Sequence, residues 1–253
     1  MRRFASAVTF LTRIPLPVAS GRDLSGAAPW FPIVGALIGT SLAGVYALGY
    51  RFLPSLLVAV ITVVVGIVVT GAIHEDGLAD SFDAIGTGAA GEEGLAIMRD
   101  SRLGTYGTSA LVVSILWRVI ALGSLEPQLA LVALVSAHSL ARAGAVVLMA
   151  VTDPARPDGL GRSGVVGVTA QGASVAAIVG VAVFAVLGGW WALPGLALVG
   201  AAVFWFRRVA RRRFGGVTGD LLGACEQVGE MMVLTLVAGV AWLGGTPWWG
   251  GAS

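Results

Sequence analysis

Three aspartates in the stretch 74–83 (HEDGLADSFD) have the spacing of residues that share one face of a helix. Asp76, Asp80 and Asp83 stand at i, i+4 and i+7, so an α-helix would hold their carboxylates on one side. Such carboxylates repel one another unless a cation binds them, and hard oxygen ligands suit Mg²⁺ or Mn²⁺. The alternative is a solvated acidic helix start, which the helix dipole favours. We expect a metal face, because the stretch directly follows an apolar run of membrane-spanning length, where ionisable groups are costly and usually functional.

A second polar stretch, 98–107 (MRDSRLGTYG), combines positive charge with residues that favour a turn. Arg99 and Arg102 present paired donors that match phosphate oxygens, and Asp100 adds a carboxylate between them. Gly104 lets backbone N–H groups turn toward an anion. The same pattern also fits a turn whose arginines anchor the chain at the membrane surface. The sequence leaves both interpretations open.

A third group of polar residues interrupts the last apolar run of the chain. Asp220, Gly223, Gln227 and Glu230 fall on one face of a helix there, and polar groups on a membrane helix point toward a cavity or a partner. Packing through small residues, with Asp220 as a helix cap, explains part of the same pattern. Arg142 is a single cation within an earlier apolar run, so we expect it to pair with Asp220, Glu230 or a phosphate.

The elements that must position these residues are membrane helices, because 57% of the residues are hydrophobic and only 12% are charged. The mean hydropathy is +0.88, and the apolar character extends along the whole chain. The expected fold is an all-α, polytopic integral membrane helix bundle that forms a single domain over 1–253. About seven transmembrane helices are predicted, with a range of six to eight. The apolar segments lie at 29–50, 56–73, 108–125, 129–151, 173–190, 192–206 and 221–243.

The distribution of charge predicts which side of the membrane the polar stretches face. Every basic residue is an arginine, and most of them fall on the side of the three longest loops, at 74–107, 152–172 and 207–220. By the positive-inside rule this side is cytoplasmic. We therefore expect a protein of the bacterial cytoplasmic (inner) membrane with its active site facing the cytoplasm. A net charge of +2 gives no indication of a nucleic-acid partner.

Four motifs together carry a resemblance to a known family. They are the stretches 10–17 (FLTRIPLP), 74–83 (HEDGLADSFD), 99–105 (RDSRLGT) and 218–224 (TGDLLGA). In this order and at this spacing they resemble cobalamin synthase, the adenosylcobinamide-GDP ribazoletransferase family. The resemblance implies transfer of the adenosylcobinamide phosphoryl group from adenosylcobinamide-GDP to α-ribazole or its 5′-phosphate, with release of GMP. The family commonly has Glu where this chain has Gln227, so we leave Gln227 out of the expected ligands. Either the ligand role is not essential at that position, or the neighbouring Glu226 substitutes after a small rotation.

The resemblance also implies roles for individual residues. The expected ligands of Mg²⁺, or of Mn²⁺ in its place, are Asp76, Asp80, Asp83, Asp220 and Glu230. The expected substrate-binding residues are Arg99, Asp100, Arg102, Gly104 and Arg142. Asp83 is the first candidate for the base that takes the ribazole hydroxyl proton, and His74 is the second.

Two other functions remain as alternatives. The aspartate pattern is similar to that of CDP-alcohol phosphotransferases, but their Ala-Arg pair is missing, because Ala79 is followed by Asp80. An ion-coupled transporter would explain the charges within apolar runs, yet the sequence shows no internal repeat. For the enzyme, the expected partners are the two small-molecule substrates and the membrane. The sequence also leaves room for association with other cobalamin-pathway enzymes and for an oligomer.

Overall fold

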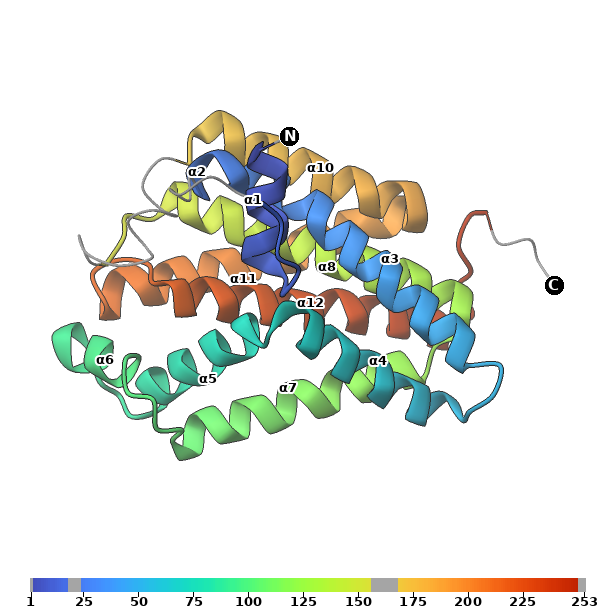
Figure 1. Ribbon diagram of the computed structural model, residues 1–253, viewed down its shortest axis with the longest axis horizontal. Coiled ribbons are helices and arrows are strands. Elements are labelled where there is room, and N and C mark those ends of the chain that lie inside the picture. Colours follow the sequence, from blue (N-terminus) through green and yellow to red (C-terminus); the bar gives the residue numbers. More distant parts are fainter. Residues whose placement is uncertain (1, 18–23, 156–167, 250–253) are drawn as a thin grey trace.

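Helices make up nearly all regular structure in residues 2–17, 24–155 and 168–249, the ranges that the computed structural model describes (Figure 1). Apolar runs form helices because in lipid each backbone N–H and C=O needs a partner within the chain. The helices are α1 (Arg2–Leu11), α2 (Leu24–Ala27), η1 (Ala28–Trp30), α3 (Phe31–Gly49), α4 (Ser55–Thr70), α5 (Ile73–Gly86), α6 (Gly91–Ile97), α7 (Thr105–Gly123), α8 (Pro127–Val151), α10 (Ala170–Gly188), η2 (Gly189–Trp191), α11 (Ala192–Arg213) and α12 (Gly219–Trp242). The predicted all-α fold is confirmed.

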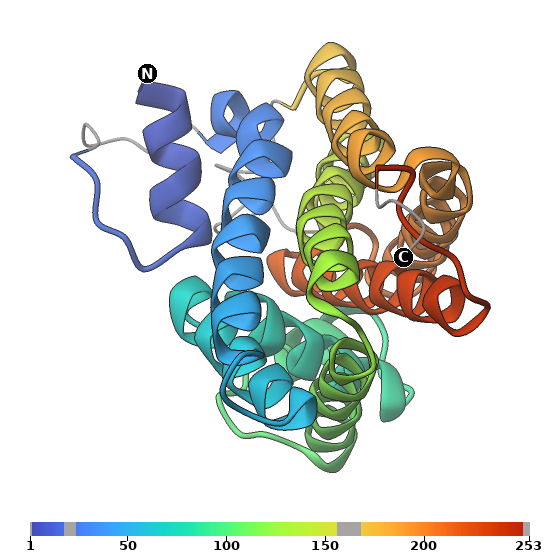
Figure 2. The same cartoon turned by 90° about the vertical axis from the view of Figure 1, so that its right-hand side faces the viewer.

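Helix α8 forms the centre of the bundle. It packs against α3, α10, α11 and α12 (Figure 2). Most of its side chains are buried. The closest contact is with α3, where a Cβ atom at Gly35 or Gly39 would overlap the backbone of α8. Small residues at one-turn spacing let two membrane helices approach in this way. The polar side chains in the middle of α8, those of Ser136, His138, Ser139 and Arg142, therefore lie inside the bundle.

A sharp corner separates α4 from α5 and gives α5 its direction. The two helices meet at 90°, and the residues at the corner, Gly71 and Ala72, have φ angles of 68° and 59°. A non-glycine residue in this region costs about 1–3 kcal/mol, so surrounding contacts must hold it. The segment after α1 provides them, because the Arg13 N–H donates to the Val69 carbonyl oxygen at 2.8 Å. Part of the motif at 10–17 thus fixes the corner.

Five helical segments of the described chain are long and apolar enough to cross a membrane, or six if α4 and α5 make one bent span. The five segments are Ala28–Gly49, Thr105–Gly123, Pro127–Val151, Ala170–Arg213 and Gly219–Trp242. The upper count of six agrees with the lower end of the predicted range of six to eight spans. The sequence count of seven divided Ala170–Arg213 in two, and this stretch contains both α10 and α11, which run in opposite directions (Figure 1).

The region 74–107, predicted as a loop between spans, contains α5 and α6 and is therefore mainly helical. The low hydropathy of this region reflects its charged residues, and a charged helix packed on the end of a bundle needs no long apolar run. The prediction of one domain over 1–253 remains a prediction.

Candidate active site

The aspartates of α5 and the first turn of α12 form one acidic surface, the aspartate face, made of Asp76, Asp80, Asp83 and Asp220. The other three carboxylates all act electrostatically on Asp80. The helices approach closely because α5 has a glycine at the contact: a Cβ atom at Gly77 would lie 2.8 Å from the Asp220 carbonyl oxygen. The predicted one-sided arrangement of aspartates is therefore present, and α12 adds its own aspartate to it.

The three aspartates of α5 differ in their surroundings. Asp76 is exposed, Asp80 is partly buried and Asp83 is buried. The Asp83 carboxylate accepts hydrogen bonds from the backbone N–H groups of Gly104, at 2.7 Å, and Gly107, at 2.8 Å. These are free N–H groups at the start of α7, which a carboxylate can cap. A Cβ atom at either glycine would overlap the carboxylate. Asp83 thus anchors the loop before α7 to α5.

The loop 98–104 carries the predicted phosphate-binding arginines next to the aspartate face. It is held to the start of α12 by a contact from the Thr218 hydroxyl to the Met98 sulfur at 3.6 Å. Arg102 pairs with Asp100 at 2.5 Å, which lowers the pKa of Asp100 to about 2. This pair is solvent-exposed, so it contributes little to stability. Arg99 is also exposed. Both guanidinium groups are accessible from water.

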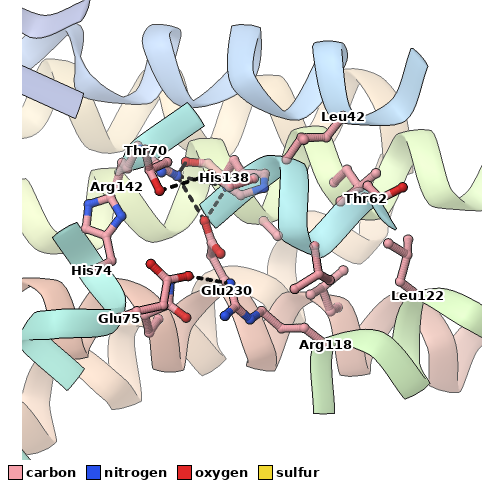
Figure 3. A pocket seen from close by; sticks show the side chains of 16 residues that line it. Leu42, Thr62, Thr70, His74, Glu75, Arg118, Leu122, His138, Arg142 and Glu230 are labelled. Carbon is pink, nitrogen blue, oxygen red and sulfur yellow. Dashed lines mark hydrogen bonds and ion pairs between the residues drawn. The ribbon is translucent and has the colours of Figure 1, made fainter. Parts of the chain in front are cut away.

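Arg142 lies deeper, in a second polar group that we call the buried charge cluster: His74, Glu75, Arg118, His138, Arg142, Glu226 and Glu230. Figure 3 shows all of these side chains except that of Glu226. The Arg142 guanidinium lies 2.7 Å from the Glu226 carboxylate and 3.0 Å from that of Glu230. Arg142 therefore has two carboxylate partners, of which Glu230 was predicted. Asp220 lies ten residues before Glu230, which is about 15 Å along a helix. Glu230 is thus part of the buried charge cluster and does not join the aspartate face.

Sequence reasoning missed several members of this cluster. His138 pairs with Glu230, and Glu75 pairs with Arg118 at 2.9 Å. His138 stands one helical turn before Arg142 within an otherwise apolar span, and that spacing was the available signal. His74, the second candidate base, has its Nδ1 atom 3.5 Å from Glu226 and so faces the cluster.

All members of the buried charge cluster except Glu226 line a cavity of about 30 Å³, which is enough for ordered water (Figure 3). Among the buried atoms that lack a hydrogen-bond partner are Glu75 Oε2, Arg118 Nη2 and Arg142 Nη2, all from residues that line this cavity. Unsatisfied buried polar atoms are costly, so water that bridges them would stabilise the bundle. The paired charges and the small size of the cavity are typical of a structural core.

Two groups of residues have the chemistry to hold a metal ion. Ligand atoms of His138, Glu226 and Glu230 lie within 4.8 Å of one another. However, Arg142 Nη1 lies within about 3 Å of all three residues and already supplies a positive charge there. The aspartate face is more open, since Asp76 is exposed and Asp80 is only partly buried. Its accessible carboxylates fit a hard divalent cation that keeps water or substrate ligands.

Comparison with known proteins identifies the family. A family model described as Cobalamin-5-phosphate synthase matches residues 3–238. The chain belongs to this family. The match to the Cobalamin-5-phosphate synthase family includes α5, the loop before α7 and the acidic first turn of α12, so the aspartate face lies wholly within it. The resemblance inferred from four motifs is confirmed.

Relatives within the Cobalamin-5-phosphate synthase family extend over nearly the whole chain. An adenosylcobinamide-GDP ribazoletransferase of Bradyrhizobium diazoefficiens is 41% identical over 92% of this chain and 91% of its own length. Its counterpart in Mesorhizobium japonicum is 40% identical over 94% of this chain and 92% of its own length. A Vibrio cholerae protein of the same name is 35% identical, over 92% of each chain. No solved structure matches the chain.

Proposed function

We propose that this protein is an adenosylcobinamide-GDP ribazoletransferase. It transfers the adenosylcobinamide phosphoryl group from adenosylcobinamide-GDP to α-ribazole, or to α-ribazole 5′-phosphate, and releases GMP. The observation that carries this proposal is the aspartate face, which lies beside two exposed arginines in a chain that belongs to the Cobalamin-5-phosphate synthase family. Neither a CDP-alcohol phosphotransferase nor a transporter explains that combination.

The aspartate face suits displacement at a diphosphate. In the proposed site Asp76, Asp80 and Asp220 would hold Mg²⁺, or Mn²⁺ in its place, which would supply positive charge to neutralise the diphosphate. Arg99 and Arg102 bind non-bridging phosphate oxygens, which for Arg102 requires the exposed pair with Asp100 to open. Positioning and charge stabilisation are the main requirements of such a transfer.

The identity of the base remains a prediction. Asp83 was the first candidate, but both of its carboxylate oxygens already accept backbone hydrogen bonds. A metal role for Asp83 and Glu230, and substrate contacts by Asp100, Gly104 and Arg142, are likewise predictions. In our proposal Arg142 acts from within the buried charge cluster, where it keeps α8 and α12 in register.

We also propose that the protein lies in the bacterial cytoplasmic membrane with the aspartate face toward the cytoplasm. Support comes from the arginines: Arg211, Arg212 and Arg213 end α11, and Arg213 donates to the carbonyl oxygens of Ile85 and Ala89 beside α5. This end of the bundle is therefore the positively charged one. Association with other enzymes of cobalamin synthesis and oligomer formation are further expectations.

The test is GMP release by the purified protein with adenosylcobinamide-GDP and either form of ribazole, with and without Mg²⁺. We expect release to require Mg²⁺ and to fall on the order of 100-fold or more in Asp76→Asn and in Asp80→Asn. Glu92→Gln is the matched control, because Glu92 is an exposed carboxylate on neighbouring α6. Folded wild-type protein that releases no GMP with either acceptor would refute the proposal.

A further inference from the structure

The end of α11 carries a basic groove that the proposed reaction does not use. It is lined by Phe204, Arg207, Arg208, Arg211 and Arg212 and has a volume of about 410 Å³. These residues follow one another at spacings of three, four, seven and eight, so they form one stripe along a helix. We call the hollow that these five residues line the arginine groove.

The charges of the arginine groove are not neutralised within the described chain. Among the described residues, the arginines that form ion pairs are Arg102, Arg118 and Arg142, and none of the four groove arginines is one of them. Arg207 donates to the Val151 carbonyl oxygen, which leaves its charge unpaired. Four cations within about two helical turns repel one another, and the helix dipole offsets only part of that cost near the last turn. The groove therefore favours a bound anion.

The surroundings of the groove indicate which anion fits. Phe204, which lines the groove, is 67% exposed, and the adjacent Trp205 is 43% exposed. Both belong to the stretch Ala170–Arg213, which is long and apolar enough to cross a membrane, and the arginines occupy the last two turns of its final helix. Aromatic side chains next to arginines are typical of the boundary between hydrocarbon and water. The groove therefore fits a ligand that carries both a phosphate group, for the arginines, and a hydrocarbon part, for the aromatic side chains.

We propose that the arginine groove binds the headgroup of an anionic phospholipid, with its acyl chains lying against Phe204 and the apolar surface of α11. Basic residues at a cytoplasmic membrane surface attract anionic lipids by about 1 kcal/mol each. A soluble phosphate ester would leave the exposed aromatic side chains without a partner. The substrate diphosphate has a better site at the aspartate face.

Bound lipid would also stabilise the aspartate face. Arg213, in the same helical turn as Arg211 and Arg212, is directed away from the groove: its guanidinium donates to the Ile85 and Ala89 carbonyl oxygens at 2.9 and 3.0 Å. Ile85 is in the last turn of α5, close to Asp83 in the chain, and Ala89 follows shortly after the end of that helix. A lipid that holds the end of α11 therefore holds the helix that carries three of the aspartates.

The test compares binding of phosphatidylglycerol and phosphatidylcholine to the detergent-purified full chain by native mass spectrometry. We expect the wild type to prefer phosphatidylglycerol, and Arg208→Gln/Arg211→Gln to weaken that binding roughly 30-fold, the product of two charges at about fivefold each. Phosphatidylglycerol should also raise the melting temperature of the wild type and not that of the double variant. The charge-conserving Arg208→Lys/Arg211→Lys should keep most of the preference.

The matched control is Arg2→Gln/Arg3→Gln, which removes two exposed arginines from α1. This control should bind phosphatidylglycerol like the wild type. Equal binding of the two lipids, an equal loss in the control, or displacement of lipid by inorganic phosphate at the lipid's own concentration would each overturn the proposal. Because binding and melting are measured without substrate, these outcomes are independent of the proposed transferase reaction.

Discussion

Asp76, Asp80 and Asp83 share one face of α5, but their carboxylates have different contacts. Asp76 and Asp80 remain accessible, whereas Asp83 is buried and its two oxygens accept N–H groups from the start of α7. Because both oxygens of Asp83 accept backbone hydrogen bonds, this carboxylate holds the loop before α7 in place. It is less available to a metal or a proton, so we expect Asp83 to differ from its neighbours when each is changed.

Asp83→Asn tests whether this residue anchors the loop. The amide group would present its NH₂ to a backbone N–H of Gly104 or Gly107, which leaves a buried donor unsatisfied and costs about 1–3 kcal/mol. Thermal unfolding of the purified protein should therefore shift to lower temperature, and GMP release should fall as the loop loosens. Asp80→Asn is the control, which should lose activity with little change in melting temperature. An Asp83→Asn variant of wild-type stability without turnover would favour the catalytic base instead.

At the scale of elements, contacts between helix backbones decide where the acidic groups meet. Gly77 allows α5 to pack on the first turn of α12, and the corner at Ala72 directs α5 toward that contact. The corner in turn depends on the segment after α1, through Arg13. Three pieces of chain that are distant in sequence therefore set the geometry of the aspartate face.

Gly77→Ala should separate the two helices. The added methyl group would lie 2.8 Å from the Asp220 carbonyl oxygen, which is closer than packing allows, so α5 must shift. We expect a loss of stability of about 1–3 kcal/mol and a fall in turnover of roughly 100-fold, as for a misplacement of reacting groups by about 1 Å. Melting curves and GMP release measure the two effects.

The matched control is Gly44→Ala on α3, where a Cβ atom would meet no other atom within 4 Å. This substitution should leave both turnover and melting temperature near those of the wild type. If Gly77→Ala behaved in the same way, the close contact between α5 and α12 would not be needed for activity.

At the scale of the whole molecule, charge and hydropathy give the bundle two different ends. The loop 98–104 and the last turn of α11 lie at the end with the arginines and the aspartate face, while the turn after α7 lies at the opposite end (Figure 1). Helix α7, Thr105–Gly123, is a candidate span that connects the two. Its 19 residues give a length of about 28 Å, close to the thickness of the hydrocarbon core.

Cysteine labelling tests the proposed orientation. Ser101 and Ser124 flank α7 and are both exposed, and the single native cysteine, Cys225, is buried. In intact cells a membrane-impermeant maleimide should label Ser124→Cys from outside, while Ser101→Cys should react only after the membrane is opened. The unmodified chain, with Cys225 alone, gives the background. Labelling of Ser101→Cys in intact cells would reverse the orientation.

The sequence by itself determined the features that depend on local periodicity and composition. The apolar runs predicted a helical membrane bundle, the i, i+4, i+7 spacing predicted the shared face of three aspartates, and four motifs predicted the family. These succeeded because hydropathy and helical spacing operate over neighbouring residues. The charge of Arg142 also predicted a carboxylate partner, and Glu230 is one.

Only the tertiary structure decided which distant residues meet. Asp83 contacts the start of α7, Arg142 has Glu226 as its second partner, and His138 joins Glu230. The bend between α4 and α5 sets the direction of the helix that carries the aspartates. Each of these outcomes depends on close contact between helices that are far apart in the chain. Spacing within one helix shows which residues share a face, but only packing determines what that face contacts.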